Sequence, residues 1–249
     1  MLTPYPPSMP DDAERRAADG GWMLAIDTAS EIAGLALFDG GELYLRQWPC
    51  VRAQTTQVLP AIHELLTQAG ISLSDLTSVA VATGPGTFTG LRVGMSLAKG
   101  FAVGNSLPVI GVPTLQATAF PWTRIGAPII AVVPAGRGRL VWQRFEGNDS
   151  QDGVGIEPRN STPLELVESV RGRPVAAIVG DLTPPLRDAL RELPIPIIAG
   201  PETPARVGSI AALGFERHLR DDHDDAAALE PQYVHGPRKA TQVNKEPRP

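Results

Sequence analysis

Apolar runs separated by short polar turns open the chain and predict a start made of three strands. The first run, residues 22–27, ends in an aspartate, and a second apolar run covers residues 32–38. An Asp-Gly-Gly sequence then gives a hairpin signal before a third strand at 42–48. This order of strands and turns predicts an antiparallel meander.

A helical period replaces the strand pattern at residue 54, and from there helices alternate with strands. Apolar positions recur every three or four residues over 54–69. We then predict a buried strand at 79–82, a helix at 90–103, a strand at 108–112 and a short helix at 114–120. Three strands at the start distinguish this order from a Rossmann pattern, which begins with strand, helix and strand.

The second half carries the same kinds of element and repeats the first half only loosely. After a proline-bounded boundary at 121–128, we predict strands at 129–134, 140–145, 175–179 and 195–198 and helices at 162–170, 184–190 and 205–219. We therefore expect two lobes, 22–120 and 121–235. Residues 1–21 have little to bury and predict a disordered extension, and residues 236–249 form a basic tail.

The segment 79–103 combines a strand, a glycine-rich loop and a helix. Gly84 and Gly86 allow a tight turn, and Thr87 is placed to cap the helix. Backbone N–H groups at such a helix start suit an anion. A Walker motif, however, needs Lys and Ser or Thr after its last glycine, and Leu-Arg stands here instead. Two interpretations stay open, namely a turn built for close packing and a phosphate-binding loop.

Two faces of the helix 90–103 are suited to packing. Gly90, Gly94, Ala98 and Ala102 make a face of small residues, and Val93, Leu97 and Phe101 make a bulky one. Small side chains let a second helix approach closely. We therefore expect burial on both sides, either inside the chain or against a partner.

Composition limits the classes of function. The chain has 249 residues, 43% of them hydrophobic, which is enough for two modest domains. A net charge of −5 without a long basic patch argues against binding nucleic acid alone. Cys50 is the single cysteine, so no internal disulfide can form. No apolar run reaches membrane-spanning length and residues 1–21 do not resemble a signal peptide, so we expect a cytoplasmic protein.

No pattern of catalytic residues stands out. His63, His218, His223 and His235 are scattered, which does not predict a metal site, and there is no Gly-x-Ser-x-Gly motif. Asp27 and Thr28 follow the first strand and suit either a metal-bound phosphate or a cap on the turn. Asp181 likewise suits a turn or a second acidic group near a cleft. We expect no catalytic residue and no metal ligand in this chain.

Four stretches of the sequence resemble the bacterial TsaB (YeaZ) family, which takes part in making threonylcarbamoyladenosine in tRNA. They are LAIDTASEIAGLAL (24–37), QTTQVLP (54–60), VATGPGTFTGLRVGMSLAKGFAV (81–103) followed by VIGVPTLQA (109–117), and EPQYV (230–234). The GPGTFTGLR sequence is the specific part. The likeness is close in the first half of the chain and weak in the second.

The resemblance implies an α/β fold of the actin-like ATPase type, in the sugar-kinase and heat-shock ATPase superfamily, with two βββαβα-type lobes. It also implies a non-catalytic subunit that scaffolds and activates a related transferase, TsaD, which carries the metal-binding histidines. A small ATPase, TsaE, would join them. This chain would need no cofactor, because ATP and metal would bind to the partner subunits. It would form a homodimer when alone, and would meet tRNA only through the complex.

The family pairs through helices of the first lobe, which here would be 54–69 and 90–103. The residues implied for this partner interface are Val58, Ile62, His63, Leu66, Gly94, Ala98, Phe101 and Ala102. The candidates for nucleotide or phosphate binding are Asp27, Thr28, Gly84, Gly86 and Thr87.

The sequence departs from the family pattern at two places. Gln54 stands where the family often has His, and residues 134–141 read PAGRGRLV where it usually has a D-A-R-R-G-E-V-Y-like hairpin. The alternative function is an active phosphotransferase or ATPase of the same superfamily, motivated by Asp27 and the glycine loop. A peptidase is a third possibility, but no nucleophile and base support it.

Overall fold

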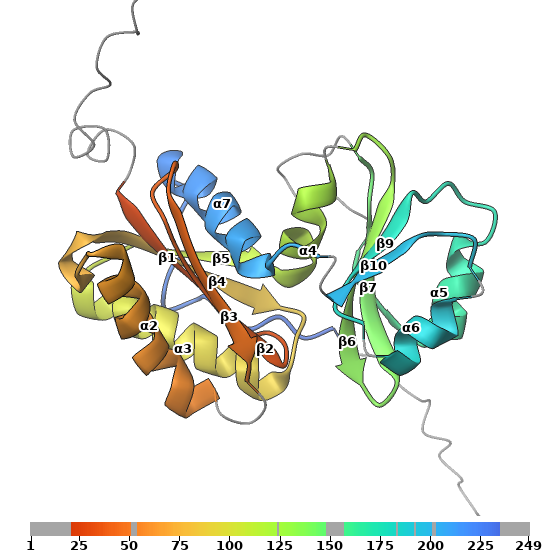
Figure 1. The fold of residues 1–249 in the computed structure, drawn as a ribbon, viewed down its shortest axis with the longest axis horizontal. Helices are drawn as coiled ribbons and strands as arrows, with labels where there is room; N and C mark the ends of the chain where they lie inside the picture. The colour runs from red at the N-terminus through yellow and green to blue at the C-terminus, as the bar shows by residue number, and fades with distance from the viewer. Residues whose placement is uncertain are drawn as a thin grey trace, which may run out of the picture.

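Two five-stranded sheets, each with its own helices, form the two lobes of the molecule (Figure 1). The computed structural model describes residues 21–50, 54–123, 125–147, 157–182, 184–191, 193–200 and 203–234. The expected N-terminal extension (1–21, except Gly21) and basic tail (236–249) lie outside these residues. The predicted two-lobed α/β fold of the actin-like type is confirmed.

The first sheet has the strand order β3-β2-β1-β4-β5. Its strands are β1 (Trp22–Asp27), β2 (Ile32–Phe38), β3 (Leu43–Pro49), β4 (Leu76–Gly84) and β5 (Val109–Pro113). The first three pair antiparallel, which confirms the predicted meander, and β4 and β5 run parallel to β1. The helices α2 (Gln54–Ala69) and α3 (Phe88–Asn105) cover one face, and a short 3-10 turn, η1 (Leu73–Asp75), precedes β4.

The second sheet repeats the first, strand for strand. Its order β10-β9-β6-β7-β8 has the same antiparallel and parallel pairs in the same sequence positions. The strands are β6 (Ile129–Gly136), β7 (Arg139–Phe145), β8 (Arg159–Ser161), β9 (Ala177–Gly180) and β10 (Ile197–Ala199), with helices α5 (Pro163–Val170) and α6 (Pro184–Leu190) on one face. The sequence predicted only a loose repeat and missed β8, because three residues are too few to show a period.

The last helix of each lobe packs on the sheet of the other lobe. Helix α4 (Thr114–Thr123) places Leu115 and Ala119 in the core of the second sheet. Helix α7 (Arg206–Leu219) places its apolar side on Met23 and other residues of the first sheet, as Figure 1 shows in blue beside β1. The predicted division into 22–120 and 121–235 is therefore wrong for α7, because a sequence boundary cannot reveal that a helix returns to the first lobe.

Strand β1 lies between α2 and α3 on one face of the sheet and α7 on the other. Its side chains point alternately to the two faces. Leu24 and Ile26 point to α2 and α3, whereas Met23 and Ala25 point to α7. All four are buried. Both faces of the first sheet are thus covered, which explains why β1 is a continuous apolar run.

The small-residue face of α3 packs inside its own lobe. A Cβ atom added to Gly90 would lie 1.9 Å from the carbonyl oxygen of Thr28, and one added to Gly94 would lie 2.3 Å from the Thr28 hydroxyl. Ala98 and Ala102 are buried in the same core. Gly94, Ala98 and Ala102 are covered by their own lobe, so their assignment to a partner interface is wrong. The close approach that Gly90 and Gly94 allow is to Thr28, directly after β1.

Most of the interface residues predicted on α2 are buried as well. Val58, Ile62 and Leu66 belong to the first core, whereas His63 is exposed. Phe101 on α3 is half-buried against that core. The helix period identified the apolar stripe correctly, but a stripe alone does not say whether it faces the core or a partner.

Substitutions at two glycines of α3 test which side of this helix faces the core of the first lobe. Gly90→Ala should lower the free energy of unfolding by about 1–3 kcal/mol, because the added methyl group collides with the Thr28 backbone. Gly100→Ala should raise it by about 0.5–1 kcal/mol, because nothing lies within 4 Å of its added Cβ and alanine favours the helix. Urea denaturation of both variants measures this difference. Equal effects would show that α3 is rotated from the orientation described.

Candidate functional site

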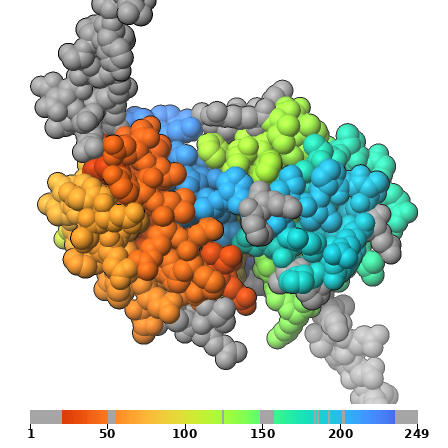
Figure 2. All heavy atoms as spheres, in the orientation of Figure 1, coloured from red at the N-terminus to blue at the C-terminus, as the bar shows by residue number. Residues whose placement is uncertain are grey.

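Two cavities meet at the boundary between the lobes. Their volumes are about 390 and 450 Å³, and they share the lining residues Ser30, Ile32, Asp181, Gly200 and Arg206. They lie beyond the carboxyl ends of β1 and β9, which is where open α/β sheets usually bind ligands. In Figure 2 the orange first lobe and the green-to-cyan second lobe face each other across this boundary. This cleft is the candidate site.

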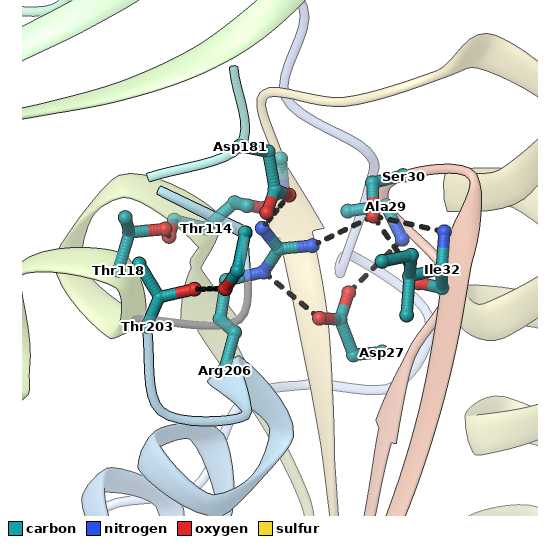
Figure 3. A network of polar contacts seen from close by, with 11 residues as sticks. Asp27, Ala29, Ser30, Ile32, Thr114, Thr118, Asp181, Thr203 and Arg206 are labelled. Atoms are coloured by element: carbon teal, nitrogen blue, oxygen red, sulfur yellow. Dashed lines mark hydrogen bonds and ion pairs between the residues drawn. The ribbon is translucent and has the colours of Figure 1, made fainter. Parts of the chain in front are cut away.

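Arg206 lies at the centre of the cleft and joins the two lobes (Figure 3). Its Nε donates to Asp27 Oδ2 at 2.8 Å, and its Nη1 donates to Asp181 Oδ2. Its Nη2 donates to Ser30 Oγ at 3.3 Å. Asp27 is the last residue of β1, Asp181 follows β9, and Arg206 begins α7. A single side chain thus connects both sheets.

Arg206, Asp27 and Asp181 form an ion triad, and its three side chains are removed from water to different degrees. The side chains of Arg206 and Asp27 are only 9% and 5% exposed, whereas that of Asp181 is 33% exposed. Burial alone would lower the pKa of Arg206, but attraction to Asp27 and then to Asp181 offsets this, and the pKa is raised above its ordinary value. The guanidinium therefore stays charged between the two carboxyl groups.

The two residues predicted to meet a metal-bound phosphate are engaged within the protein. The second oxygen of Asp27, Oδ1, accepts from the backbone N–H of Ala29 at 3.0 Å. Thr28 is buried, and its hydroxyl donates to the carbonyl of Gly90 at 2.7 Å. The structure thus gives Asp27 a structural ion pair and Thr28 a role in holding α3 against β1.

The glycine loop is likewise held against its own lobe. Gly84 donates its N–H to Thr114 Oγ1 at 3.1 Å, and Thr87 donates its N–H to the carbonyl of Ala29 at 2.7 Å. A Cβ on Gly86 would lie 2.5 Å from that same carbonyl oxygen. These contacts favour the close-packing interpretation of the loop over the phosphate-binding one, because two of its N–H groups already have partners.

Sequence reasoning missed the residue at the centre of the site. Arg206 was only the start of a predicted helix, and its partners lie 179 and 25 residues away. One local signal existed, because a cation in the first turn of a helix opposes the helix dipole and is unfavourable without a carboxylate partner. Asp181, which the sequence left open between a turn and a cleft residue, lies in the cleft.

The described part of the chain contains no group of three or more His, Cys, Asp or Glu side chains arranged to hold a metal ion. His63 is exposed on α2. Nδ1 of His218 and Nε2 of His223 lie 3.0 Å apart near the end of α7, away from the cleft. None of the helices described here is both long and apolar enough to cross a membrane.

The chain was compared with known proteins. Residues 50–158 match the family described as "TsaD: tRNA N6-adenosine threonylcarbamoyltransferase". "tRNA threonylcarbamoyladenosine biosynthesis protein TsaB" of Escherichia coli is 38% identical, and the match spans 58% of this chain and 64% of that protein. The protein of the same name from Buchnera aphidicola subsp. Schizaphis graminum is 31% identical over 59% of this chain and 70% of its own length. The structure described as "YeaZ from Pseudomonas aeruginosa" has the same fold, with a TM-score of 0.67 at 20% identity over 86% of this chain and all of that one.

The importance of the triad can be measured by removing its cation. Arg206→Leu should lower the free energy of unfolding by about 3–5 kcal/mol, because Asp27 stays buried and loses its cationic partner. Neutralising both carboxylates in that background, with Asp27→Asn and Asp181→Asn, should recover part of the loss.

Arg171→Leu is the control for this measurement, because Arg171 forms an ion pair with Glu168 in which both side chains are exposed to solvent. It should change the free energy of unfolding by about 0.5 kcal/mol or less. If Arg206→Leu cost no more than this control, the triad would not hold the lobes together.

Proposed function

Because the chain belongs to the TsaB family, we propose that it is a non-catalytic subunit of the complex that forms N6-threonylcarbamoyladenosine in tRNA. It scaffolds and activates a TsaD-like catalytic subunit, and a TsaE-like ATPase joins the pair. ATP and metal bind to those partners. This chain meets tRNA within the complex, and it forms a homodimer when alone.

The non-catalytic role is supported above all by the arginine side chain that occupies the cleft. Two carboxylates at strand ends, Asp27 and Asp181, face each other across it as ligands of a metal–nucleotide complex would. The cation between them is the protein's own Arg206. A hard metal ion prefers several free oxygen ligands, and both oxygens of Asp27 already accept hydrogen bonds.

The docking surface proposed for the catalytic subunit is the outer side of α2 and α3, at the lower left of Figure 1. It carries exposed residues next to small ones: Leu59, His63, Ser96, Gly100 and Val103. Gly100 and Gly104 have open space around an added Cβ, so a partner helix can come close there. This surface replaces the buried residues that the sequence suggested.

Val103 tests this surface, because its side chain is 74% exposed. Val103→Gln should weaken pairing with the catalytic subunit, and any homodimer, because an amide buried without a partner costs about 1–3 kcal/mol. That corresponds to roughly 5- to 150-fold in Kd. The melting temperature of the isolated chain should move little.

Leu164→Gln provides the matched control, since Leu164 is 73% exposed on α5 of the other lobe. Its effect on pairing should be absent when both variants are titrated against the catalytic subunit by calorimetry. Pairing that is unchanged by Val103→Gln would place the interface on another surface.

The alternative, an active phosphotransferase or ATPase, predicts turnover by this chain alone. We expect the isolated protein to hydrolyse little ATP in the presence of Mg²⁺, because Asp27 is paired with Arg206. A phosphate-release assay on the purified chain measures this. Robust hydrolysis that disappears in a folded Asp27→Asn variant would refute the scaffold role and establish the enzyme.

A further inference from the structure

An aromatic and guanidinium cluster lies on the surface where α3 begins. The Phe88 and Tyr233 rings stack with centroids 5.5 Å apart and an angle of 29° between their planes. The guanidinium carbon of Arg92 lies 3.9 Å from the centroid of Phe88, and Arg92 Nε donates to the Tyr233 hydroxyl at 3.3 Å. Phe88 is nevertheless 58% exposed. We call these three residues the Phe88 cluster.

The contacts around the Phe88 cluster hold it in one arrangement before any partner binds. Gln232 donates its N–H to the carbonyl of Thr83 at 2.7 Å, and Asn160 Nδ2 donates to the carbonyl of Val234 at 2.9 Å. The backbone is therefore fixed on both sides of Tyr233. Because the two rings and the guanidinium also restrict one another, a partner that binds them costs little side-chain entropy.

The end of the Arg92 side chain remains available to a partner. Its Nε donates to the Tyr233 hydroxyl, but its Nη1 and Nη2 make no hydrogen bond within the described residues. Arg92 is exposed, and stacking on Phe88 fixes the plane of its guanidinium. A planar fork of free N–H groups matches the two oxygens of a carboxylate. The Phe88 cluster is therefore suited to a carboxylate that has an apolar group beside it.

The Phe88 cluster begins an exposed row along the outer side of α3. Phe88, Arg92, Ser96, Gly100 and Gly104 follow one another at intervals of four residues, and all five are exposed. At 1.5 Å per residue the row is about 24 Å long. Its second half has no side chain larger than that of serine, so a partner helix can lie close there and extend to the Phe88 cluster. The cluster thus continues the docking surface proposed on α2 and α3 (Figure 1).

A protein helix suits this row better than a nucleic acid does. A phosphate backbone is bound by several cations along its path. Arg92 is the only cation among the five residues of the row, and the other cation of α3, Lys99, is half-buried. A single arginine beside small uncharged residues fits one carboxylate on a helix.

A second copy of this chain cannot supply that carboxylate through the same two helices. Residues 54–69 and 88–105 contain one acidic residue between them, Glu64. Glu64 already forms an ion pair with Arg46 of β3. In a homodimer formed through the outer sides of α2 and α3, Arg92 would be covered without a carboxylate partner, which is unfavourable for a charge removed from water.

We infer that the Phe88 cluster selects the catalytic subunit over a second copy of this chain. A helix of the catalytic subunit places an aliphatic side chain on the Phe88 ring and a carboxylate on Nη1 and Nη2 of Arg92. This inference rests on the proposed function, and it adds the residues that decide between the two partners. Specificity is a difference between two affinities, and Arg92 strengthens one pairing while it weakens the other.

Two variants of Arg92, titrated by calorimetry against the catalytic subunit, test the inference. Arg92→Met keeps the length of the side chain and removes its charge, so it should raise the Kd of the heterodimer roughly 10- to 100-fold, as loss of a central interface arginine does. Arg92→Glu should raise this Kd further, because one carboxylate would then face another. The Kd of the parent heterodimer should rise with salt, and that of Arg92→Met should rise less.

The homodimer should respond differently. Sedimentation equilibrium of the chain alone should give a homodimer Kd that is unchanged or lower for Arg92→Met, because no unpaired charge has to be covered. Arg171→Glu is the control, since Arg171 is 70% exposed at the end of α5 in the other lobe, and it should change neither Kd. Thermal melting shows that each variant remains folded.

Phe88→Ala tests the apolar part of the cluster without changing a charge. It should raise the Kd of the heterodimer roughly 5- to 100-fold, because it removes an exposed ring that a partner would cover. Its heterodimer should keep a salt dependence, because Arg92 is still present.

Several results would overturn the inference. Arg92→Met could pair with the catalytic subunit as the parent does, or it could weaken the homodimer by the same factor as the heterodimer. Equal effects of Arg92→Met and Arg92→Glu would show that no carboxylate faces Arg92. A labelled single-stranded RNA that binds the parent but not Arg92→Met, with pairing unchanged, would make the Phe88 cluster a nucleic-acid contact instead.

The proposed function can fail separately. If Val103→Gln weakens pairing and Arg92→Met does not, the docking surface stands and the role of the Phe88 cluster alone is refuted. If the parent chain does not pair with the catalytic subunit at all, the proposed function is refuted, and this inference with it.

Discussion

The charge of Arg206 has to be balanced inside the protein, because its side chain is almost entirely removed from water. The two carboxylates that balance it end strands of different sheets, so the charge is satisfied only when the lobes keep one relative position. That requirement also fixes α7, because its first residue has to reach the boundary while its apolar side covers the first sheet. The exchange of α4 and α7 between the lobes and the ion triad therefore depend on each other.

The triad also decides what the cleft can do. Carboxylates that face each other across a boundary attract a cation, and here a side chain of the chain itself provides it. A guanidinium held by two carboxylates stabilises a structure but does not exchange as a substrate does. The triad in the cleft thus holds the two lobes together, and the docking surface proposed on α2 and α3 lies outside the cleft.

Helix α3 connects this surface with the core. Its inner side is held to β1 through Thr28, which donates to Gly90 and fills the space beside Gly94. With the inner side held in this way, the outer side presents Phe88 at one end and Val103 at the other. The glycine-rich sequence that looked like a phosphate loop is what allows this close contact, because any larger side chain would push the helix away from the sheet.

Local features of this protein were determined by the sequence itself. The apolar runs at 22–27 and 32–38, the glycine turns and the helix period of 54–69 predict β1, β2 and α2 with their observed bounds. The reason is that strand and helix periods and turn chemistry depend on near neighbours. Asp27 was recognised as a residue at a strand end, but not as one partner of an ion pair.

Only the tertiary structure decided which side of α3 faces inward, which sheet α7 covers and which cation meets Asp27. Arg206 and Asp27 are 179 residues apart, and Arg92 and Tyr233 are 141 apart. No local pattern couples residues at such separations, because the contact exists only after both lobes and the crossing helices have packed. The small residues of α3 show the same limit, since their spacing predicts a close contact but does not identify the element that makes it.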